Sequence, residues 1–218
     1  MNAPGGLPIP LARAELPAVR SAGAQADKFR DLRSRLRLEV LRGRRCALAV
    51  VSPDPGDGRT YLATNLAIAF SQLGERTLLI DADLRRPRQH ELLGVDYEPG
   101  LAGVLAGLLP PDEAVEPVPG IPGLHVLPAG AVPPNPAELL ERPNFATLVR
   151  DMLQHFAHVI VDTSAAARGP DARNVAAHCG LSVVLARRGR STMASLQALL
   201  GSLARGPGEV AGLIINER

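Results

Sequence analysis

Short apolar runs alternate with amphipathic helical patterns along most of the chain, and this alternation predicts the fold. Apolar runs bounded by polar or turn-forming residues are typical of buried strands, and they lie at 46–51, 76–80, 124–127, 159–162, 181–186 and 210–215. Apolar residues at helical spacing predict helices in between, at 62–73, 101–108, 137–141, 145–156, 171–178 and 192–204. Strands that alternate with helices of this length indicate an α/β fold with a doubly wound, mostly parallel sheet and helices on both faces.

The first 24 residues differ from the rest of the chain, because they have no periodicity and are rich in proline, glycine and alanine. We expect residues 1–24 to form a flexible leader and residues 25–218 to form one domain, which suits the length of the chain. The domain opens with apolar residues at helical spacing, beginning near Asp27, and arginines line a neighbouring face. Such a basic face is ordinarily solvated, and a subunit contact is the alternative.

The composition limits the classes of function. The formal net charge is only +2, which gives no support for binding to nucleic acid. No apolar run approaches the roughly 20 residues that cross a bilayer, and the N-terminus lacks the pattern of a secretory signal. We therefore expect a cytoplasmic protein that reaches a membrane only through a partner.

A glycine- and proline-rich turn connects the first predicted strand to the helix that follows it and has the features of a phosphate-binding loop. Gly56 and Gly58 lack Cβ atoms, so backbone N–H groups can approach an anion at the N-terminus of the helix. Thr60 supplies a hydroxyl where such loops bind Mg²⁺. The usual G-x-x-x-x-G-K-[ST] pattern is altered, because Pro53 replaces its first glycine and Arg59 replaces its lysine. The alternative is an ordinary turn between a strand and a helix.

Carboxylates follow two of the predicted strands, at the edge where an open parallel sheet binds ligands. Asp81 and Asp83 come directly after the second strand, and Asp162 ends a later one. Beside a phosphate loop, such carboxylates can hold Mg²⁺ through water or orient an attacking hydroxyl, although aspartates after a strand also form ordinary turns. A basic cluster at 85–90 follows and offers arginines to a phosphate or to a neighbouring subunit.

Four segments are informative as a set: PGDGRT at 55–60, NLAIAFSQLGERTLLIDADLR at 65–85, LPAGAVPPNPAELL at 127–140 and VIVDT at 159–163. Together they resemble the bacterial tyrosine kinases (BY-kinases) of the capsular and exopolysaccharide chain-length-determinant family, and its EpsG-type branch above all. The resemblance implies a cytoplasmic P-loop kinase that is related to the ParA/MinD ATPases and uses ATP and Mg²⁺. It also implies an inner-membrane polysaccharide co-polymerase as partner, through its cytoplasmic segment, and a role in polysaccharide polymerisation, chain length and export.

The same resemblance implies which residues hold the nucleotide and the metal. The nucleotide-binding loop would comprise Pro55, Gly56, Asp57, Gly58, Arg59, Thr60 and Tyr61. Thr60 would bind Mg²⁺ directly, and Asp83 and Asp162 would hold it through water. Arginine at position 59 looks like an EpsG-type feature.

Catalysis would depend on a second set, Arg59, Asp81, Asp83 and Arg85. Asp81 would orient the acceptor hydroxyl, whereas the two arginines would neutralise the charge that develops on the transferred phosphoryl group. The helix that carries Asp27, Arg30 and Arg33 resembles the family's E-x-x-R-x-x-R oligomerisation helix, so a homo-oligomer is expected.

The tyrosines depart from the family, whose kinases usually carry a C-terminal cluster of tyrosines that is autophosphorylated. This sequence contains Tyr61, on the first turn of the predicted loop helix, and Tyr97, in a predicted loop. Tyr61 is a poor acceptor and Tyr97 a conceivable one, so the phosphate acceptor is otherwise expected on another protein. Two alternatives stay open: a ParA/MinD-like ATPase switch of the polysaccharide machinery without tyrosine-kinase activity, and a non-catalytic scaffold.

Overall fold

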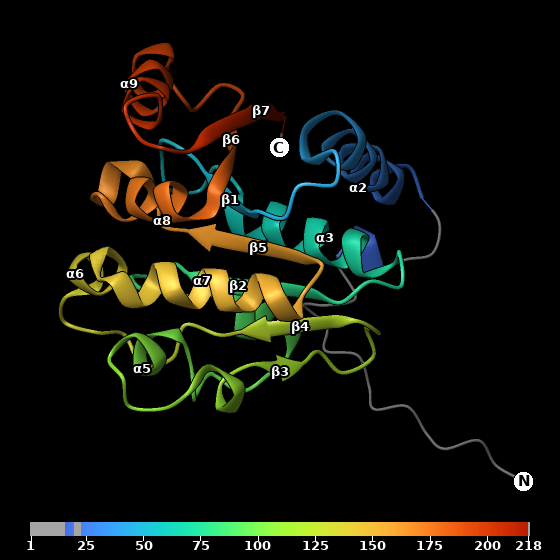
Figure 1. Ribbon diagram of the computed structural model, residues 1–218. Helices are drawn as coiled ribbons and strands as arrows, with labels where there is room; N and C mark the ends of the chain where they lie inside the picture. Colours follow the sequence, from blue (N-terminus) through green and yellow to red (C-terminus); the bar gives the residue numbers. More distant parts are fainter. Residues whose placement is uncertain (1–15, 20–22, 218) are drawn as a thin grey trace, which may run out of the picture.

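Seven strands form a single sheet in the computed structural model, which describes residues 16–19 and 23–217 (Figure 1). In chain order they are β1 (Ala47–Val51), β2 (Thr77–Ala82), β3 (Glu116–Pro117), β4 (Leu124–Leu127), β5 (His158–Thr163), β6 (Gly180–Arg187) and β7 (Glu209–Asn216). Their order across the sheet is β3-β4-β2-β5-β1-β6-β7. Every neighbouring pair is parallel except β3 with β4, which confirms the predicted mostly parallel α/β sheet.

Helices cover both faces of this sheet (Figure 1). The helical segments are η1 (Pro17–Val19), α2 (Ala24–Arg35), η2 (Leu36–Leu41), α3 (Arg59–Ser71), α4 (Gln89–Leu93), α5 (Leu101–Leu105), η3 (Pro111–Glu113), α6 (Pro136–Glu141), α7 (Pro143–His155), η4 (Ala166–Arg168), α8 (Asp171–Cys179) and α9 (Met193–Leu203). One hydrophobic core lies between the sheet and α5 to α9, and a second lies between the sheet and α3 with η1 and η2. The strands supply both cores, because successive side chains of a strand point to opposite faces.

The central strands place the candidate site. β5 lies between β1 and β2, and all five residues of β1 are buried. The register pairs Asp162 of β5 with Val50 of β1 on one side and with Asp81 of β2 on the other. The carboxyl ends of these three parallel strands therefore meet at one edge of the sheet, where the segments that follow them are brought together. Strand β2 runs past the predicted end at residue 80 because Asp81 and Ala82 still pair with β5.

Part of the predicted flexible leader is packed against the domain. Leu16 and Ala18 are buried, and they belong to the core on the α3 side of the sheet. The N–H of Ala18 donates to Oδ1 of Asn65 over 3.0 Å, and its carbonyl accepts from Nε2 of Gln72 over 2.6 Å. The leader prediction is therefore wrong for residues 16–19, because apolar side chains there complete the core against α3; residues 1–15 and 20–22 lie outside the described part.

Two helical segments differ from the sequence prediction. The short helix α4 lies within the basic cluster, where no helix was predicted, and its N-terminus is capped by a carboxylate from β2. The N-terminal helix starts at Ala24 and continues as a π-helical turn to Leu41, after which Arg42 adopts a left-handed conformation with φ of 45°. Its apolar residues lie on one side of this longer helix, as the spacing indicated.

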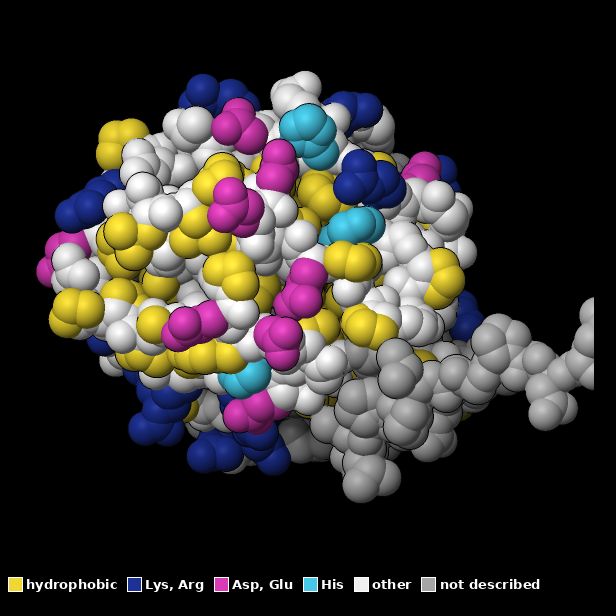
Figure 2. Space-filling view, turned by 90° about the horizontal axis from the view of Figure 1, so that it is seen from below, with side chains coloured by type: hydrophobic (Ala, Val, Ile, Leu, Met, Phe, Trp, Pro, Cys, Tyr) yellow, Lys and Arg dark blue, Asp and Glu magenta, His cyan; other side chains and the backbone are white. Residues whose placement is uncertain are grey.

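The face at the β3 end of the sheet is acidic and apolar rather than basic. Figure 2 shows acidic side chains across the middle of this face, among apolar ones, whereas Lys and Arg side chains lie mainly at its margin. Burial of Glu116 and the neighbouring charge of Asp96 raise the pKa of Glu116 above its usual value. Within residues 16–19 and 23–217, no helix is both long and apolar enough to span a membrane.

Candidate functional site

The loop between β1 and α3 has the backbone shape of an anion-binding loop. Gly56 and Gly58 have φ of 82° and 105°, in the left-handed region that favours glycine. A Cβ atom on Gly58 would lie 2.8 Å from Nδ2 of Asn216, so no larger residue fits there without a shift. Helix α3 begins at Arg59 and runs for 13 residues, and its N-terminal N–H groups and dipole favour a phosphate at this loop.

The loop is held from behind by the end of β6 and by β7. Asp57 is fully buried, and its carboxylate accepts the N–H of Asp54 (2.9 Å) and the hydroxyl of Ser191 (3.0 Å). Nδ2 of Asn216 donates to the carbonyl of Asp57 over 2.8 Å, and Arg187 donates to the carbonyl of Gly56 over 3.0 Å. The predicted nucleotide-binding residue Asp57 thus uses both its side chain and its backbone carbonyl to shape the loop.

Arg59 points into the protein at the base of the loop and is only 7% exposed. Its guanidinium donates to the carbonyls of Thr163 (2.8 Å) and Asp54 (3.0 Å) and to the hydroxyl of Ser52. The planar guanidinium group of arginine can donate to three acceptors in different directions, whereas the single ammonium group of lysine does this less well. The substitution of arginine for the usual lysine therefore ties the phosphate loop to the end of β5.

Three carboxylates gather beside the loop, at the ends of β2 and β5. Asp81 and Asp162 are fully buried and Asp83 is 6% exposed. Burial, together with the charge of Asp162, raises the pKa of Asp81 well above its usual range. Burial also raises the pKa of Asp162 to about 6, although the charge of Arg59 and hydrogen bonding by Thr60 act in the opposite direction. The predicted trio is therefore assembled, and repulsion within it favours a bound cation.

The side chain of Asp81 is occupied by backbone donors. Its carboxylate accepts the N–H groups of Asp83 (3.2 Å), Arg88 (3.1 Å) and Gln89 (3.0 Å). It therefore caps the start of α4 and shapes the turn after β2. In the described structure Asp81 positions its neighbours, and its predicted role toward an acceptor hydroxyl stays a prediction.

Gln89 links the carboxylates to the phosphate loop and was missed in the sequence. It is fully buried, and its Nε2 atom donates to Oδ2 of Asp162 (3.0 Å) and to the carbonyl of Thr60 (3.3 Å). Its Oε1 atom accepts from the hydroxyl of Thr64 over 2.7 Å. The sequence placed Gln89 only within a basic cluster, because no local pattern shows that α4 folds back onto β5.

Arg85 is held in an ion pair with Asp171. Its guanidinium makes two hydrogen bonds to the buried carboxylate of Asp171, of 2.6 and 3.1 Å, at the start of α8. The hydrogen bond that Arg85 donates to Asp171 is the main cause of a raised pKa for Arg85, and its predicted role at the phosphoryl group stays a prediction. The sequence missed Asp171 as its partner, and as described the pair joins the turn after β2 to α8.

The donor set suits a magnesium ion that arrives with a nucleotide. Oδ1 of Asp162 is buried and has no hydrogen-bond partner within the described ranges, and the half-buried hydroxyl of Thr60 lies beside the same carboxylate. Hydroxyl and carboxylate oxygens are ligands that Mg²⁺ accepts. Among the residues that the structure describes, no group of three or more His, Cys, Asp or Glu side chains forms a metal site, so phosphate oxygens and water would complete the coordination.

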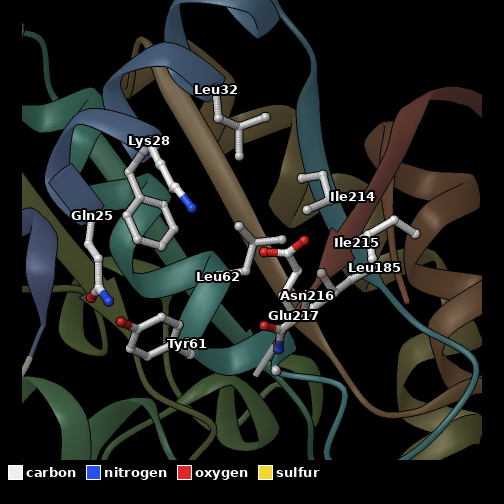
Figure 3. Close-up of a pocket in the computed structure, with 12 residues that line it drawn as sticks. Gln25, Lys28, Leu32, Tyr61, Leu62, Leu185, Ile214, Ile215, Asn216 and Glu217 are labelled. Carbon is white, nitrogen blue, oxygen red and sulfur yellow. The ribbon is translucent and has the colours of Figure 1, made fainter. Parts of the chain in front are cut away.

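A groove of about 550 Å³ opens next to the phosphate loop, between α2, the start of α3 and the end of β7 (Figure 3). Gly58 of the phosphate loop is among the residues that line it, and Asn216 lines it beside apolar side chains, among them Leu62 and Leu185. Tyr61, which is 40% exposed, forms part of the wall, with its ring edge-on to Phe29 at a centroid distance of 6.0 Å. A mostly apolar groove with a few polar groups is the usual setting for an aromatic base.

Known proteins resemble this chain in sequence. Residues 48–217 match the family model described as the CobQ/CobB/MinD/ParA nucleotide binding domain. The tyrosine-protein kinase Wzc of Salmonella typhimurium is 32% identical over 190 residues, which are 87% of this chain and 26% of that protein. The putative tyrosine-protein kinase CapB of Staphylococcus aureus is 27% identical over 192 residues, 88% of this chain and 84% of that protein.

A solved structure gives the same result. The kinase domain of the Escherichia coli tyrosine kinase ETK has a TM-score of 0.87 and 30% sequence identity, covering 100% of this chain and 84% of that domain. The chain spans about a quarter of the length of several curated relatives, including Wzc, but most of CapB. The similarity to Wzc therefore lies in one part of a longer protein.

Proposed function

Because the chain belongs to the CobQ/CobB/MinD/ParA nucleotide-binding family and, within it, to the bacterial tyrosine kinases, we propose that it transfers the γ-phosphoryl group of ATP to protein tyrosine residues. The observation that carries this proposal is the meeting of the phosphate loop with Asp81, Asp83 and Asp162 at one edge of the sheet. Phosphoryl transfer depends chiefly on positioning and on charge stabilisation, and a rigid loop beside buried carboxylates supplies both.

ATP would bind with its phosphates on residues 55–60 and its nucleoside in the groove of Figure 3. Gly58 supports this placement, because it belongs to the phosphate loop and also lines the groove, so that base and phosphates would occupy adjoining sites. Tyr61 would contact the nucleoside from the wall of the groove. Arg59, hydrogen-bonded to the carbonyls of Asp54 in the loop and Thr163 at the end of β5, would stabilise phosphate charge from below.

Thr60, Asp83 and Asp162 would hold Mg²⁺, which when bound neutralises phosphate charge. Gln89 keeps one oxygen of Asp162 occupied and leaves the other for the metal or its water. Asp81 would orient the acceptor hydroxyl through the turn that it shapes. Arg85 contributes in this proposal by fixing that turn against α8, because its guanidinium is paired with Asp171.

The setting of the activity is part of the same proposal and is supported by the sequence resemblance. We propose that residues 25–218 form the ATP-binding kinase domain and that it acts in the cytoplasm, at the inner membrane, through the cytoplasmic segment of a polysaccharide co-polymerase. It would regulate exopolysaccharide polymerisation, chain length and export. It would assemble as a homo-oligomer through the helix with Asp27, Arg30 and Arg33, and nucleic acid would not be a partner.

The test is to incubate the purified protein with Mg²⁺-ATP and a random glutamate–tyrosine copolymer, and to measure phosphotyrosine and released phosphate. We expect phosphotyrosine on the copolymer, and a loss of about 100-fold or more in Asp162→Asn. Asp151→Asn, on the exposed side of α7, is the matched control and should retain the activity.

Other outcomes would contradict the kinase. Phosphate release that requires Asp162, without phosphotyrosine on the copolymer, would indicate an ATPase switch of the ParA/MinD kind. Absence of ATP binding by calorimetry would indicate a non-catalytic scaffold.

A further inference from the structure

Tyr97 lies in the connection between α4 and α5 and is held at both ends of that connection. At one end Gly94 follows α4 with φ of 60°. At the other end the backbone of Gly100 packs closely on that of Gly130, and the N–H of Leu101 donates to the carbonyl of Pro128 over 2.7 Å. The two ends of the connection are therefore fixed by the fold, and Tyr97 lies between them.

The Tyr97 ring packs directly on the helix that supports the carboxylates. Its centroid lies 4.6 Å from that of His90, with the rings tilted by 52°. His90 follows Gln89, which bonds to Asp81 through its backbone and to Asp162 through its side chain. The residue on which Tyr97 stacks is thus the immediate neighbour of the residue that bonds to two carboxylates of the candidate site.

The surroundings of the hydroxyl agree with this location. Tyr97 is half-buried, and burial raises its pKa, with further contributions from the charges of Asp81 and Glu98. A hydrogen bond with the backbone of Val132 acts in the opposite direction. The contribution of the Asp81 charge agrees with the geometry, because Asp81 caps α4 and the Tyr97 ring packs on His90 of the same helix.

The Tyr97 ring also covers an unsatisfied polar atom. Nδ1 of His90 is buried and lacks a hydrogen-bond partner among the residues that the structure describes. If the ring moves away, water can reach this nitrogen and offset part of the lost packing. The stack is therefore a contact that Tyr97 can leave at small cost, as an acceptor residue must.

We propose that Tyr97 is a phosphorylation site of this chain and that the phosphoryl donor is ATP bound at residues 55–60. This site depends on the proposed kinase function and names one of its substrates. In the transfer, Oη of Tyr97 forms a bond to the γ-phosphorus, and the bond from that phosphorus to the bridging oxygen of ADP breaks. ADP leaves with the bridging electron pair, and the phenolic proton is released to water.

Tyr61, the other tyrosine of the sequence, has surroundings that suit an acceptor less well than those of Tyr97. Tyr61 lies on the first turn of α3, and its ring is packed against Phe29 on the wall of the groove. Its backbone carbonyl accepts a hydrogen bond from Asn65 over 2.9 Å. The backbone of Tyr61 is thus fixed within α3, next to the phosphate loop, whereas Tyr97 lies in a connection outside the helices.

The experiment uses the whole chain as wild type and Tyr97→Phe, each incubated with Mg²⁺-ATP alone and with the glutamate–tyrosine copolymer. Intact mass and phosphopeptide mapping report the chain, and phosphotyrosine reports the copolymer. We expect phosphate on Tyr97 in wild type, and a total phosphate on the chain of less than about a tenth of that level in Tyr97→Phe. Phenylalanine keeps the ring on His90, so copolymer phosphorylation should stay within about twofold of wild type.

The outcomes separate the acceptor from the kinase activity. Copolymer phosphorylation without phosphate on Tyr97 would overturn the acceptor and leave the kinase intact. Equal phosphate in wild type and Tyr97→Phe, or phosphate on Tyr61 alone, would also overturn it. No phosphate on either the chain or the copolymer would instead overturn the proposed kinase function, and the acceptor with it.

Discussion

Among single residues, Arg59 combines a structural role with its proposed role at the phosphates. Its three acceptors lie in or next to the phosphate loop, and the guanidinium is nearly buried. We expect Arg59→Ala to lower the free energy of unfolding by about 2 kcal/mol, because buried acceptors lose their donor, and to weaken ATP binding. Compared with Arg59→Ala, Arg59→Lys should recover more of the ATP affinity than of the free energy of unfolding. Lysine restores the positive charge but not the planar guanidinium group that reaches three acceptors.

Urea unfolding and calorimetric titration with ATP measure the two effects. Arg188→Ala is the control, because that side chain is 76% exposed and its pair with Glu217 is 3.8 Å long. If Arg59→Lys were as stable as wild type, the planar guanidinium group would not be needed to hold the loop.

The raised pKa of Asp162 predicts that the free energy of unfolding depends on pH. Its pKa is raised to about 6 in the folded protein, so between about pH 4 and pH 6 the unfolded chain loses this proton while the folded protein keeps it. Ionisation then lowers the free energy of unfolding as the pH rises, by about 3 kcal/mol above pH 6. We expect Asp162→Asn to be more stable than wild type at pH 7.5, although it loses activity.

The measurement is urea unfolding of both proteins at pH 4 and pH 7.5. The stability advantage of Asp162→Asn should be small at the lower pH and grow toward the higher one. An advantage that does not change with pH would contradict the raised pKa.

Among the elements, the turn after β2 and the start of α8 are joined by the pair of Arg85 and Asp171. The carboxylate is fully buried and the guanidinium side chain is 31% exposed. Arg85→Ala leaves a buried charge with one remaining donor, the hydroxyl of Ser164 at 3.3 Å, and we expect a loss of about 3 kcal/mol. The double variant Arg85→Ala/Asp171→Ala should lose less than the sum of the single variants.

Denaturant unfolding of the four proteins of this cycle gives the coupling energy. Arg88→Ala is a matched control from the same segment, since its pair with Glu91 is exposed on both sides and should contribute no more than about 0.5 kcal/mol. Additive single variants would show that the two elements are not coupled through this pair.

For the whole molecule, the proposed homo-oligomer is tested at the N-terminal helix. Arg33 donates to the carbonyl of Ala69 in α3 over 2.7 Å, so its substitution would also disturb the monomer. Asp27 is a cleaner target, because its pair with Arg30 is at the surface, with the Asp27 side chain 68% exposed. We expect Asp27→Arg to shift the protein toward monomer through like-charge repulsion, with a stability change below about 1 kcal/mol.

Analytical ultracentrifugation over a range of concentrations measures this shift, and thermal unfolding checks the monomer. Asp151→Arg, on the exposed face of α7, is the charge-matched control. Unchanged sedimentation of Asp27→Arg, in conditions where wild type assembles, would place the subunit contact elsewhere.

The parts of the site that could be predicted are those encoded by neighbouring residues. The loop glycines and the aspartates that follow β2 and β5 belong to short segments whose position after a strand already implies their edge of the sheet. Gln89 and Asp171 could not be found in this way. Their contacts join residues 73 and 86 positions apart, and each depends on how α4 and α8 pack.

The sequence by itself determined the alternation of strands and helices, the mostly parallel sheet and the phosphate loop, because apolar periodicity and glycine conformations act locally on the backbone. The tertiary structure alone decided how the side chains are used. It directs Arg59 under the loop and Arg85 to Asp171, packs residues 16–19 on α3, and stacks Tyr97 on His90. The physical reason is that a polar side chain takes the partner that packing brings within reach, and packing is a property of the whole chain.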